Sequence, residues 1–297
     1  MQSPSQRTIL LTGATGFLGS RLALALYGVG YRVIALVRSQ STSPRLDSLR
    51  PVASLYPLDQ PGWEKVFSAH QIDAVVHTAT CYGRTGETVE QVFAANTQLP
   101  LHLLSTAVEH GVGLFINTDT PLPRQINAYA LSKAQFVEWG TLMKERTGFV
   151  NLRVESLYGP GEDVSKFVAR TIRNCLDNAP HLDLTGGEQQ RDFVFIDDVT
   201  SAFIVTLEKH WHDRTGRHDY QVGSGQPVSI RSFVELAHRL CHSTTQLRFG
   251  ALPYREHELF FAQADNSALR ALGWECHTPL EIGLLQVIES ERKQTIP

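Results

Sequence analysis

Long hydrophobic runs are missing from this sequence of 297 residues. The apolar stretch nearest the N-terminus runs only from Ile9 to Leu11, which is far shorter than the core of a signal peptide. Nothing approaches the roughly 18 consecutive apolar residues of a membrane span. The sequence therefore predicts neither a secretion signal nor a membrane partner.

Cysteine and surplus positive charge are scarce as well. The four cysteines lie far apart without a C-x-x-C pair, a distribution typical of reduced thiols in the cytoplasm and not of a zinc site or a disulfide framework. Lys and Arg number 27 against 30 Asp and Glu, a net charge of −3, so the chain as a whole lacks the basic footprint of a nucleic-acid-binding protein. We expect a cytoplasmic protein without a nucleic-acid partner.

What the sequence does contain is an apolar content of 42%, enough to bury one large domain or two domains that share a core. In the N-terminal half, short apolar strands alternate with helices, which predicts an α/β fold with a doubly wound parallel sheet, the Rossmann fold. Strands are expected at residues 8–12, 32–37, 52–58, 74–78, 114–118 and 150–154, and helices at 17–27, 63–70, 88–110 and 129–146.

The pattern becomes less regular after about residue 155. Glycine and proline cluster there between helices expected at residues 164–178, 199–210, 230–242 and 266–272. We predict a dinucleotide-binding domain over residues 1–155, with a return segment near 190–210, and a smaller C-terminal substrate-binding lobe over residues 156–297.

A glycine-rich turn, TGATGFLG, joins the first strand to the first helix. Gly13 permits the tight turn, Gly16 lets a pyrophosphate approach the backbone, and Gly19 allows close packing of helix on strand. The helix N-terminus offers N–H groups to an anion. The alternative is a glycine-rich turn without a ligand. The loop residues expected to bind the cofactor are Gly13, Thr15, Gly16, Phe17, Leu18 and Gly19.

The second strand indicates which dinucleotide binds. An acid at its end would bind the ribose 2′-OH of NAD, but here the strand ends in Arg38 and Ser39. A guanidinium group pairs strongly with phosphate. We therefore expect NADP in preference to NAD, the alternative being a solvated surface arginine.

A catalytic pair is predicted at Tyr129 and Lys133, in the pattern Y-x-x-x-K. Residues four apart share one face of a helix, so the ammonium is expected beside the phenol, where it would lower the pKa of Tyr129. The phenol can then exchange a proton with a sugar hydroxyl or carbonyl while hydride moves to or from nicotinamide. The alternative is an incidental surface pair.

The loop TGATGFLG and the pair in YALSK resemble the extended short-chain dehydrogenase/reductase family, also called the NAD-dependent epimerase/dehydratase family, in its nucleotide-sugar branch. The resemblance implies that Asp59 and Gln60 lie near the adenine, and that Thr78, Ala79 and Thr80 line the dinucleotide groove. Asn96 matches an asparagine on the helix behind the active site. The resemblance also calls for a Ser or Thr before the tyrosine; Thr118 fits best, with Thr120 as the alternative.

The sequence departs from the family pattern after Thr118. Pro121-Leu122-Pro123 replaces the usual V-Y-G, and Thr118 lies 129 − 118 = 11 residues before Tyr129, about half the usual spacing. A loop on the substrate side is therefore expected to be missing. The Asp-Glu pair of the family's dehydratases is here Asp119-Thr120, which argues against a 4,6-dehydratase.

Three further segments resemble nucleotide-sugar enzymes. The resemblance gives Ser156 a contact with the sugar, and gives Arg191 and Arg255 contacts with the substrate diphosphate. Tyr82 and Arg84 are expected to reach the sugar. The alternative is that Arg191 and Arg153 are internal salt-bridge partners of Asp192 or Asp198.

Metal binding is not expected. The spacings His210-x-His212 and His238-x-x-x-His242 could suit a metal, but we find no nearby acid or cysteine to complete a set, so these histidines are predicted to be surface or half-buried residues.

We hypothesise that the chain is an NADP(H)-dependent reductase of a nucleotide-linked 4-keto-6-deoxy sugar, with the proton supplied by Tyr129. The segment Asn117-Thr118-Asp119-Thr120 and the short loop after it further resemble CDP-abequose and CDP-paratose synthase-like reductases. The alternatives are a nucleotide-sugar 4-epimerase with retained NAD and a non-catalytic NADP-binding regulator. The helices at 88–110 and 129–146 match those that form a four-helix dimer interface in the family, so a homodimer is expected.

Overall fold

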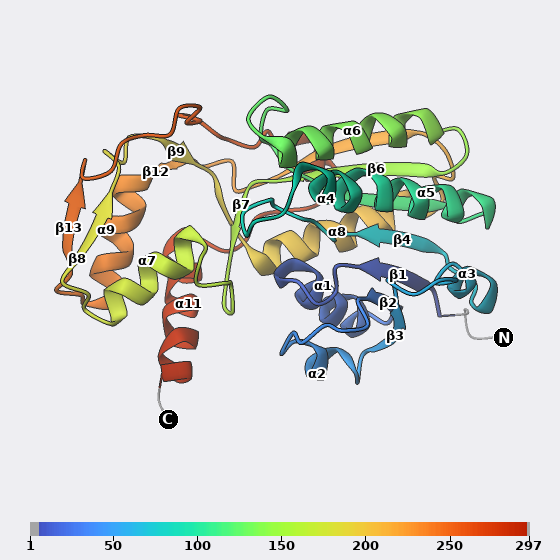
Figure 1. The fold of residues 1–297 in the computed structure, drawn as a ribbon, viewed down its shortest axis with the longest axis horizontal. Coiled ribbons are helices and arrows are strands. Elements are labelled where there is room, and N and C mark those ends of the chain that lie inside the picture. The colour runs from blue at the N-terminus through green and yellow to red at the C-terminus, as the bar shows by residue number, and fades with distance from the viewer. Residues whose placement is uncertain (1–5, 296–297) are drawn as a thin grey trace. The chain divides into compact units, whose positions relative to one another are not determined.

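The computed structural model describes residues 6–295, and seven of its strands form one sheet (Figure 1). The strands follow the order β11-β6-β5-β4-β1-β2-β3, and neighbouring strands run parallel. Their bounds are β1 Thr8–Thr12, β2 Arg32–Val37, β3 Ala53–Pro57, β4 Ala74–His77, β5 Leu114–Asp119, β6 Gly148–Val154 and β11 Arg217–Val222. The predicted doubly wound parallel sheet is confirmed, and β11 adds an edge strand that was not predicted.

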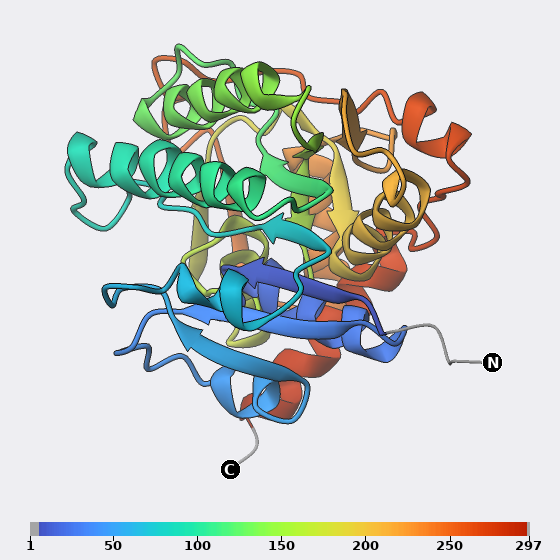
Figure 2. The same ribbon diagram turned by 90° about the vertical axis from the view of Figure 1, so that its right-hand side faces the viewer.

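The chain crosses the sheet in opposite directions on the two sides of β1. It moves from β1 to β2 and β3, and then returns to β4, β5 and β6 beyond the other side of β1. Because crossovers between parallel strands are right-handed, the two directions place their helices on opposite faces. Helix α1 (Phe17–Gly28) therefore covers one face, and helices α5 (Leu99–Glu109) and α6 (Ala128–Met143) lie along the other (Figure 2). Ligands of such sheets bind where the strand order reverses, beyond the carboxyl end of β1.

The core between this sheet and helices α5 and α6 is rich in aromatic side chains. Phe115 of β5, Phe136 of α6 and Phe149 of β6 are fully buried, with ring centroids about 6 Å apart. Helix α6 approaches the sheet closely at Gly140, where an added Cβ would lie 2.2 Å from the Phe149 ring. This packing holds the last turns of α6 against the start of β6.

The long helix expected at residues 88–110 is divided into three segments. Helix α4 (Val89–Phe93) begins with a capping box formed by Thr88 and Gln91, and the π-helical segment η1 (Ala94–Gln98) joins it to α5. A π-helical turn widens a helix locally and is often found at functional sites. Here it carries Asn96, one of the predicted site residues.

The chain divides into two compact units. The described part of the first unit runs to Arg153 and includes Thr200–Tyr220, whereas the second comprises Val154–Val199 and the chain from Gln221 onward. The return segment thus lies about ten residues later than the predicted 190–210. The first unit also contains α2 (Leu46–Leu49) and α3 (Lys65–Ala69), and α8 (Ile196–His210) enters it from the second unit.

Within the residues described, the second unit contains three two-stranded sheets and four further helices. The pairs β10-β7 and β13-β8 are parallel, and β12-β9 is antiparallel. The strands are β7 Ser156–Tyr158, β8 His181–Leu184, β9 Gln190–Arg191, β10 Phe193–Phe195, β12 Val228–Ser229 and β13 Gln246–Phe249. The helices are α7 Phe167–Leu176, α9 Ile230–Cys241, α10 Ser267–Ala271 and α11 Leu280–Thr295. Helix α11 and these short strands were not predicted.

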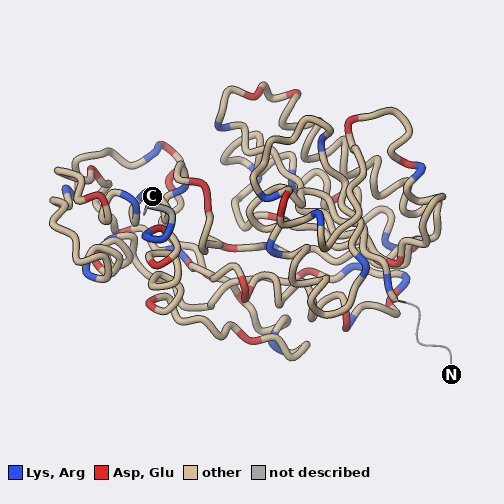
Figure 3. Tube along the Cα trace, turned by 90° about the horizontal axis from the view of Figure 1, so that it is seen from below, with Lys and Arg blue, Asp and Glu red and all other residues tan. Residues whose placement is uncertain are grey.

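The described chain shows neither a segregation of charge nor a membrane-spanning helix. Acidic and basic residues are interspersed along the trace (Figure 3). Among the described residues, no helix is both long and apolar enough to cross a bilayer. All four cysteines are free thiols. Cytoplasmic localisation stays a prediction.

Candidate functional site

The glycine loop after β1 has the geometry of a phosphate cradle. Gly13 has a φ of +73°, and a Cβ added there would lie 2.5 Å from the Ala79 nitrogen. A Cβ on Gly19 would lie 2.2 Å from the Gly13 oxygen, so both positions require glycine. Gly16 forms the N-cap of α1 without a side-chain hydrogen bond, and the first amides of the helix can therefore donate to an anion. The residues present fit the pyrophosphate of a dinucleotide.

Two hydroxyl side chains, those of Thr78 and Ser43, form hydrogen bonds with the backbone of this loop. The Thr78 hydroxyl donates to the Thr12 oxygen at 2.8 Å and lies directly under the loop. On the other side, the Ser43 hydroxyl donates to the Thr15 oxygen at 3.0 Å. Ser43 was not predicted as a site residue, because no motif marks it and its role depends on how the chain folds back after β2.

Four predicted residues meet beyond the ends of β2 and β3. Asp59 accepts hydrogen bonds from the Ser39 nitrogen at 2.8 Å and from its hydroxyl at 2.7 Å. Gln60 donates to the Ser39 hydroxyl at 3.1 Å. The bonds from Ser39 hold the pKa of Asp59 below its usual value. Arg38 is exposed beside them. The Arg38 guanidinium and the Ser39 hydroxyl therefore face solvent at the end of β2, where a dinucleotide places its adenine ribose.

Asn96 links the loop after β4 to helix α6. It is fully buried, and its side-chain oxygen accepts from the Cys81 nitrogen at 2.8 Å and from the Thr80 hydroxyl at 3.2 Å. Its amide nitrogen donates to the Cys81 oxygen at 2.8 Å and to the Ser132 hydroxyl at 3.1 Å. Because Ser132 precedes Lys133, Asn96 positions the first turns of α6 against the groove.

Tyr129 lies in the first turn of α6, which begins after the N-cap Asn127. Its hydroxyl forms a hydrogen bond with Thr120. Its ring lies against Tyr82, with centroids 5.1 Å apart, and the Arg84 guanidinium lies 5.7 Å from the centre of the Tyr82 ring. The structure therefore brings two predicted substrate residues, Tyr82 and Arg84, next to the predicted catalytic tyrosine.

The predicted lowering of the Tyr129 pKa is wrong for the protein without cofactor. Burial, followed by the neighbouring Tyr82, raises the pKa of Tyr129, and the hydrogen bond from Thr120 opposes this only in part. Lys133 is itself buried, which lowers its pKa to about 8 against a smaller opposing effect of Asp119. Desolvation outweighs the attraction that the sequence suggested. The phenol is consequently protonated at neutral pH.

The two candidate hydroxyls differ in their surroundings. The Thr118 hydroxyl is buried and has no hydrogen-bond partner among the described residues. The Thr120 hydroxyl accepts from the Leu122 nitrogen at 3.3 Å in addition to its bond with Tyr129. Thr118 thus keeps a free hydrogen-bonding capacity, which a buried hydroxyl rarely does.

A buried polar chain behind β5 was missed from the sequence. Asn117 donates to the Asn151 oxygen at 2.8 Å, and Asn151 donates to Asp119 and to Asp219, each at 3.1 Å. His77 is also fully buried, bound to the Thr12 hydroxyl at 2.7 Å, and burial together with Lys133 holds its pKa well below the usual value. These residues come from strands that are distant in the sequence, and no local motif marks them.

Arg191 and Arg255 are near neighbours in the second unit. Burial lowers the pKa of Arg191, and the positive charge of Arg255 lowers it further. Arg191 forms an ion pair of 2.6 Å with Glu258, and both side chains are largely buried. Burial also raises the pKa of the neighbouring Glu155 to about 7. Ser156 begins β7, and its nitrogen donates to the Asp192 oxygen at 3.0 Å.

The alternative partners considered for Arg191, Asp192 and Asp198, are engaged elsewhere. Asp192 is fully buried and accepts from the Ser224, Gly225 and Ala264 nitrogens. Asp198 accepts from the amides of residues 277 and 278. The salt bridge of Arg191 is therefore real, but its partner is Glu258, which lies 67 residues away and could not be identified by spacing.

Three of the four histidines follow the expectation: His212 and His242 are exposed, and the half-buried His238 binds the Thr245 oxygen at 2.9 Å. His210 is buried instead. The expectation that no acid completes a metal set is wrong, because Asp213 lies between His210 and His218, with one donor atom of each residue within 4.8 Å of the others. The turn after α8 creates this cluster.

Comparison with known proteins gives consistent matches. The model of the "NAD dependent epimerase/dehydratase family" matches residues 9–223. A CDP-abequose synthase of Salmonella muenchen is 30% identical over 292 residues, which cover 95% of this chain and 97% of that protein. A dTDP-4-dehydro-6-deoxy-D-allose reductase of Streptomyces bikiniensis is 28% identical over 75% of this chain and 78% of its own length.

Solved structures match the fold. The crystal structure of a UDP-glucose 4-epimerase with UDP-glucose from Thermotoga maritima has a TM-score of 0.84 at 24% identity, over 97% of this chain and 99% of that chain. At this identity the likeness shows the fold alone.

Proposed function

The chain belongs to the NAD-dependent epimerase/dehydratase family, and we propose that within it the chain is an NADP(H)-dependent reductase of a nucleotide-linked 4-keto-6-deoxy sugar. The resemblance found in the sequence, including that to CDP-abequose synthase, is confirmed by these matches. The chain is an NAD(P)-dependent enzyme of nucleotide-sugar chemistry, and two similar proteins are named as a synthase of a CDP-sugar and a reductase of a dTDP-sugar.

The observation that carries the choice of a reductase is the exposed Arg38 beside Ser39 at the carboxyl end of β2. A guanidinium and a hydroxyl held by Asp59 suit a 2′-phosphate, which distinguishes NADP from NAD. An enzyme that consumes its cofactor benefits from this preference, whereas an epimerase that recycles a retained NAD does not.

Tyr129 is suited to donate the proton in this reaction. Reduction of a ketone needs a proton donor, and burial raises the pKa of the Tyr129 phenol. The intact pair Tyr129 and Lys133 likewise argues against a non-catalytic regulator.

In the proposed mechanism, the glycine loop and Arg38 would hold NADPH, which would supply the hydride. Tyr129 donates its phenolic proton to the carbonyl oxygen of the sugar. The Thr118 hydroxyl, which is buried and free of other partners, donates a hydrogen bond to the same oxygen, and Thr120 orients the phenol. The Lys133 ammonium then stabilises the phenolate that proton donation leaves behind, and it binds the nicotinamide ribose.

We propose that Arg191 and Arg255 bind the substrate diphosphate. Arg191 is held by Glu258 in the free protein, so a diphosphate has to compete with this carboxylate. Burial, and to a smaller extent the nearby charge of Arg255, lowers the pKa of Arg191, and an anion between the two guanidinium groups would offset their repulsion. Ser156 is assigned to the sugar, with Tyr82 and Arg84 beside the catalytic tyrosine.

The stoichiometry of cofactor use tests this proposal. The purified chain is mixed with NADPH and a set of nucleotide 4-keto-6-deoxy sugars, beginning with CDP-linked ones because of the similarity to CDP-abequose synthase. A reductase oxidises one NADPH per sugar reduced. Epimerisation without net change in NADPH absorbance would establish the 4-epimerase, and binding of NADPH without any product would establish the regulator.

A further inference from the structure

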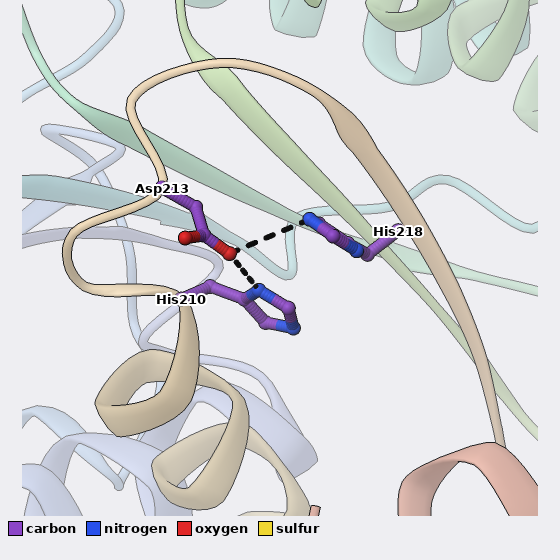
Figure 4. Close-up of side chains that lie close together, drawn as sticks. All are labelled: His210, Asp213 and His218. Carbon is purple, nitrogen blue, oxygen red and sulfur yellow. Dashed lines mark hydrogen bonds and ion pairs between the residues drawn. The ribbon is translucent and has the colours of Figure 1, made fainter.

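Three metal-ligating side chains converge where helix α8 ends and strand β11 begins (Figure 4). The His210 Nδ1 lies 2.7 Å from a carboxylate oxygen of Asp213, and the His218 Nε2 lies 3.5 Å from the same oxygen. His210 is the last residue of α8, Asp213 lies in the turn that follows, and His218 is the second residue of β11. The two imidazole rings are 4.0 Å apart.

These separations are close to those of ligands around one metal ion. Zinc binds imidazole nitrogen and carboxylate oxygen at about 2.0–2.2 Å in tetrahedral sites, which places neighbouring ligand atoms about 3.3 Å apart. A small outward shift of Asp213 from His210 would accommodate such an ion. Two imidazoles and one carboxylate select first-row transition metals, whereas magnesium and calcium prefer a shell of oxygen ligands.

The surroundings of the cluster orient its ligands. The Tyr220 hydroxyl lies 2.8 Å from the His210 Nε2 in a buried contact, the kind of outer partner that fixes the ring of a metal-bound histidine.

The backbone around the cluster is fixed as well. Gly216 donates to the Lys144 oxygen at 2.6 Å and accepts from the Phe149 nitrogen at 2.9 Å. A Cβ added to Gly148 would lie 2.1 Å from the Asp213 oxygen, so the turn rests directly on the start of β6. The turn thus presents its ligands from a rigid support.

We infer that His210, Asp213 and His218 form a binding site for a divalent first-row transition-metal ion such as Zn²⁺. The ion would fasten the edge strand β11 to the end of α8. The cluster lies at the amino end of β11, whereas Thr118, Tyr129 and Arg38 lie at the carboxyl ends of their strands or beyond them. The site therefore lies apart from the residues of the proposed reductase, and water would complete the coordination of the ion.

Metal titration of the full chain without a histidine tag tests the site. The protein is treated with a chelator, and Zn²⁺ binding is measured by calorimetry, with Mg²⁺ as the negative control. A second chelator-treated sample is titrated with Co²⁺, because the visible spectrum of bound Co²⁺ reports coordination by nitrogen and oxygen ligands. We expect one Zn²⁺ per chain, a Co²⁺ spectrum of a low-coordinate site, and a higher melting temperature with Zn²⁺.

Two variants and a matched control decide whether these residues are the ligands. His218→Gln and Asp213→Asn should each weaken Zn²⁺ binding by roughly tenfold or more and change the Co²⁺ spectrum. His212→Gln removes an exposed histidine next to Asp213 and should bind like the wild type. The absence of stoichiometric Zn²⁺ binding in the wild type, or equal affinity of all four proteins, would overturn the proposal and leave a metal-free hydrogen-bonded cluster. The NADPH affinity of each variant shows whether it is folded.

Discussion

Tyr129 is the residue on which the chemistry depends, because its buried phenol holds the proton that reduction requires. Replacement by phenylalanine removes one hydroxyl and keeps the ring against Tyr82. We expect Tyr129→Phe to lower kcat by about 10²–10⁴-fold and to leave the Kd of NADPH within a factor of two. Substrate turnover and cofactor fluorescence measure the two effects. Substantial turnover by this variant would exclude Tyr129 as the acid.

Arg38 governs the choice between the two dinucleotides. The loss of charge-assisted bonds worth roughly 1.5–3 kcal/mol should raise the Kd of NADPH by at least about tenfold in Arg38→Ala and leave the Kd of NADH unchanged. Arg32 is exposed at the other end of the same strand and serves as the control, since Arg32→Ala should change neither constant. Equal affinities of the wild type for NADPH and NADH would contradict the assignment.

Lys133 is expected to reduce the stability of the fold. Burial lowers its pKa from 10.5 to about 8, so the folded protein carries the full cost of a buried charge below pH 8. Between pH 8 and 10.5 the unfolded chain binds more protons than the folded one, and stability rises with pH. Lys133→Met should therefore stabilise the fold by on the order of 3 kcal/mol below pH 8, less at pH 10, and abolish turnover.

Thermal unfolding at several pH values measures this difference. Lys209→Met, at an exposed position of α8, is the control and should show no comparable dependence on pH. A Lys133→Met variant less stable than the wild type at pH 7 would show that the ammonium is well compensated where it lies.

At the scale of the element, the start of α1 depends on close contact between its first turn and the loop. A methyl group on Gly19 would collide with the Gly13 oxygen, whereas one on Gly28, at the other end of the helix, would meet nothing within 4 Å. Gly19→Ala should lower both stability and NADPH affinity. Gly28→Ala should be neutral or stabilise by about 0.4–1 kcal/mol.

Chemical denaturation and NADPH titration of both variants test this contrast. If Gly19→Ala retained wild-type cofactor affinity, the loop would not be the phosphate cradle that its geometry indicates.

The helices of the first unit were predicted well where the periodicity of apolar residues sets their position. They were predicted poorly where tertiary contacts set their geometry. The position of α1 follows from its glycine loop and apolar face. The π-helical segment η1 could not be predicted, because it exists where Asn96 reaches the Cys81 backbone and Ser132. Its partners come from a loop and from another helix, and residue patterns do not encode such distances.

At the scale of the whole molecule, α4 and α6 expose apolar side chains that a second copy of the chain would cover. Val89, Phe93, Trp139 and Leu142 are between 45% and 73% exposed, and α4 packs beside α6. We therefore propose a homodimer through these helices. Leu142→Glu should convert the dimer to a monomer, as measured by light scattering. Leu252→Glu, at an exposed leucine of the second unit, should leave it intact. A monomeric wild type would contradict the proposal.

Local sequence was sufficient to predict the parallel sheet, the glycine loop and the pair Tyr129 and Lys133, because alternating hydrophobicity, required glycines and helical spacing are all short-range properties. The protonation of Tyr129, the pairing of Arg191 with Glu258 and the His210–Asp213–His218 cluster emerged only once the chain was folded. Burial and long-range proximity set the pKa values and partners of these groups, and both arise when segments distant in the sequence pack together.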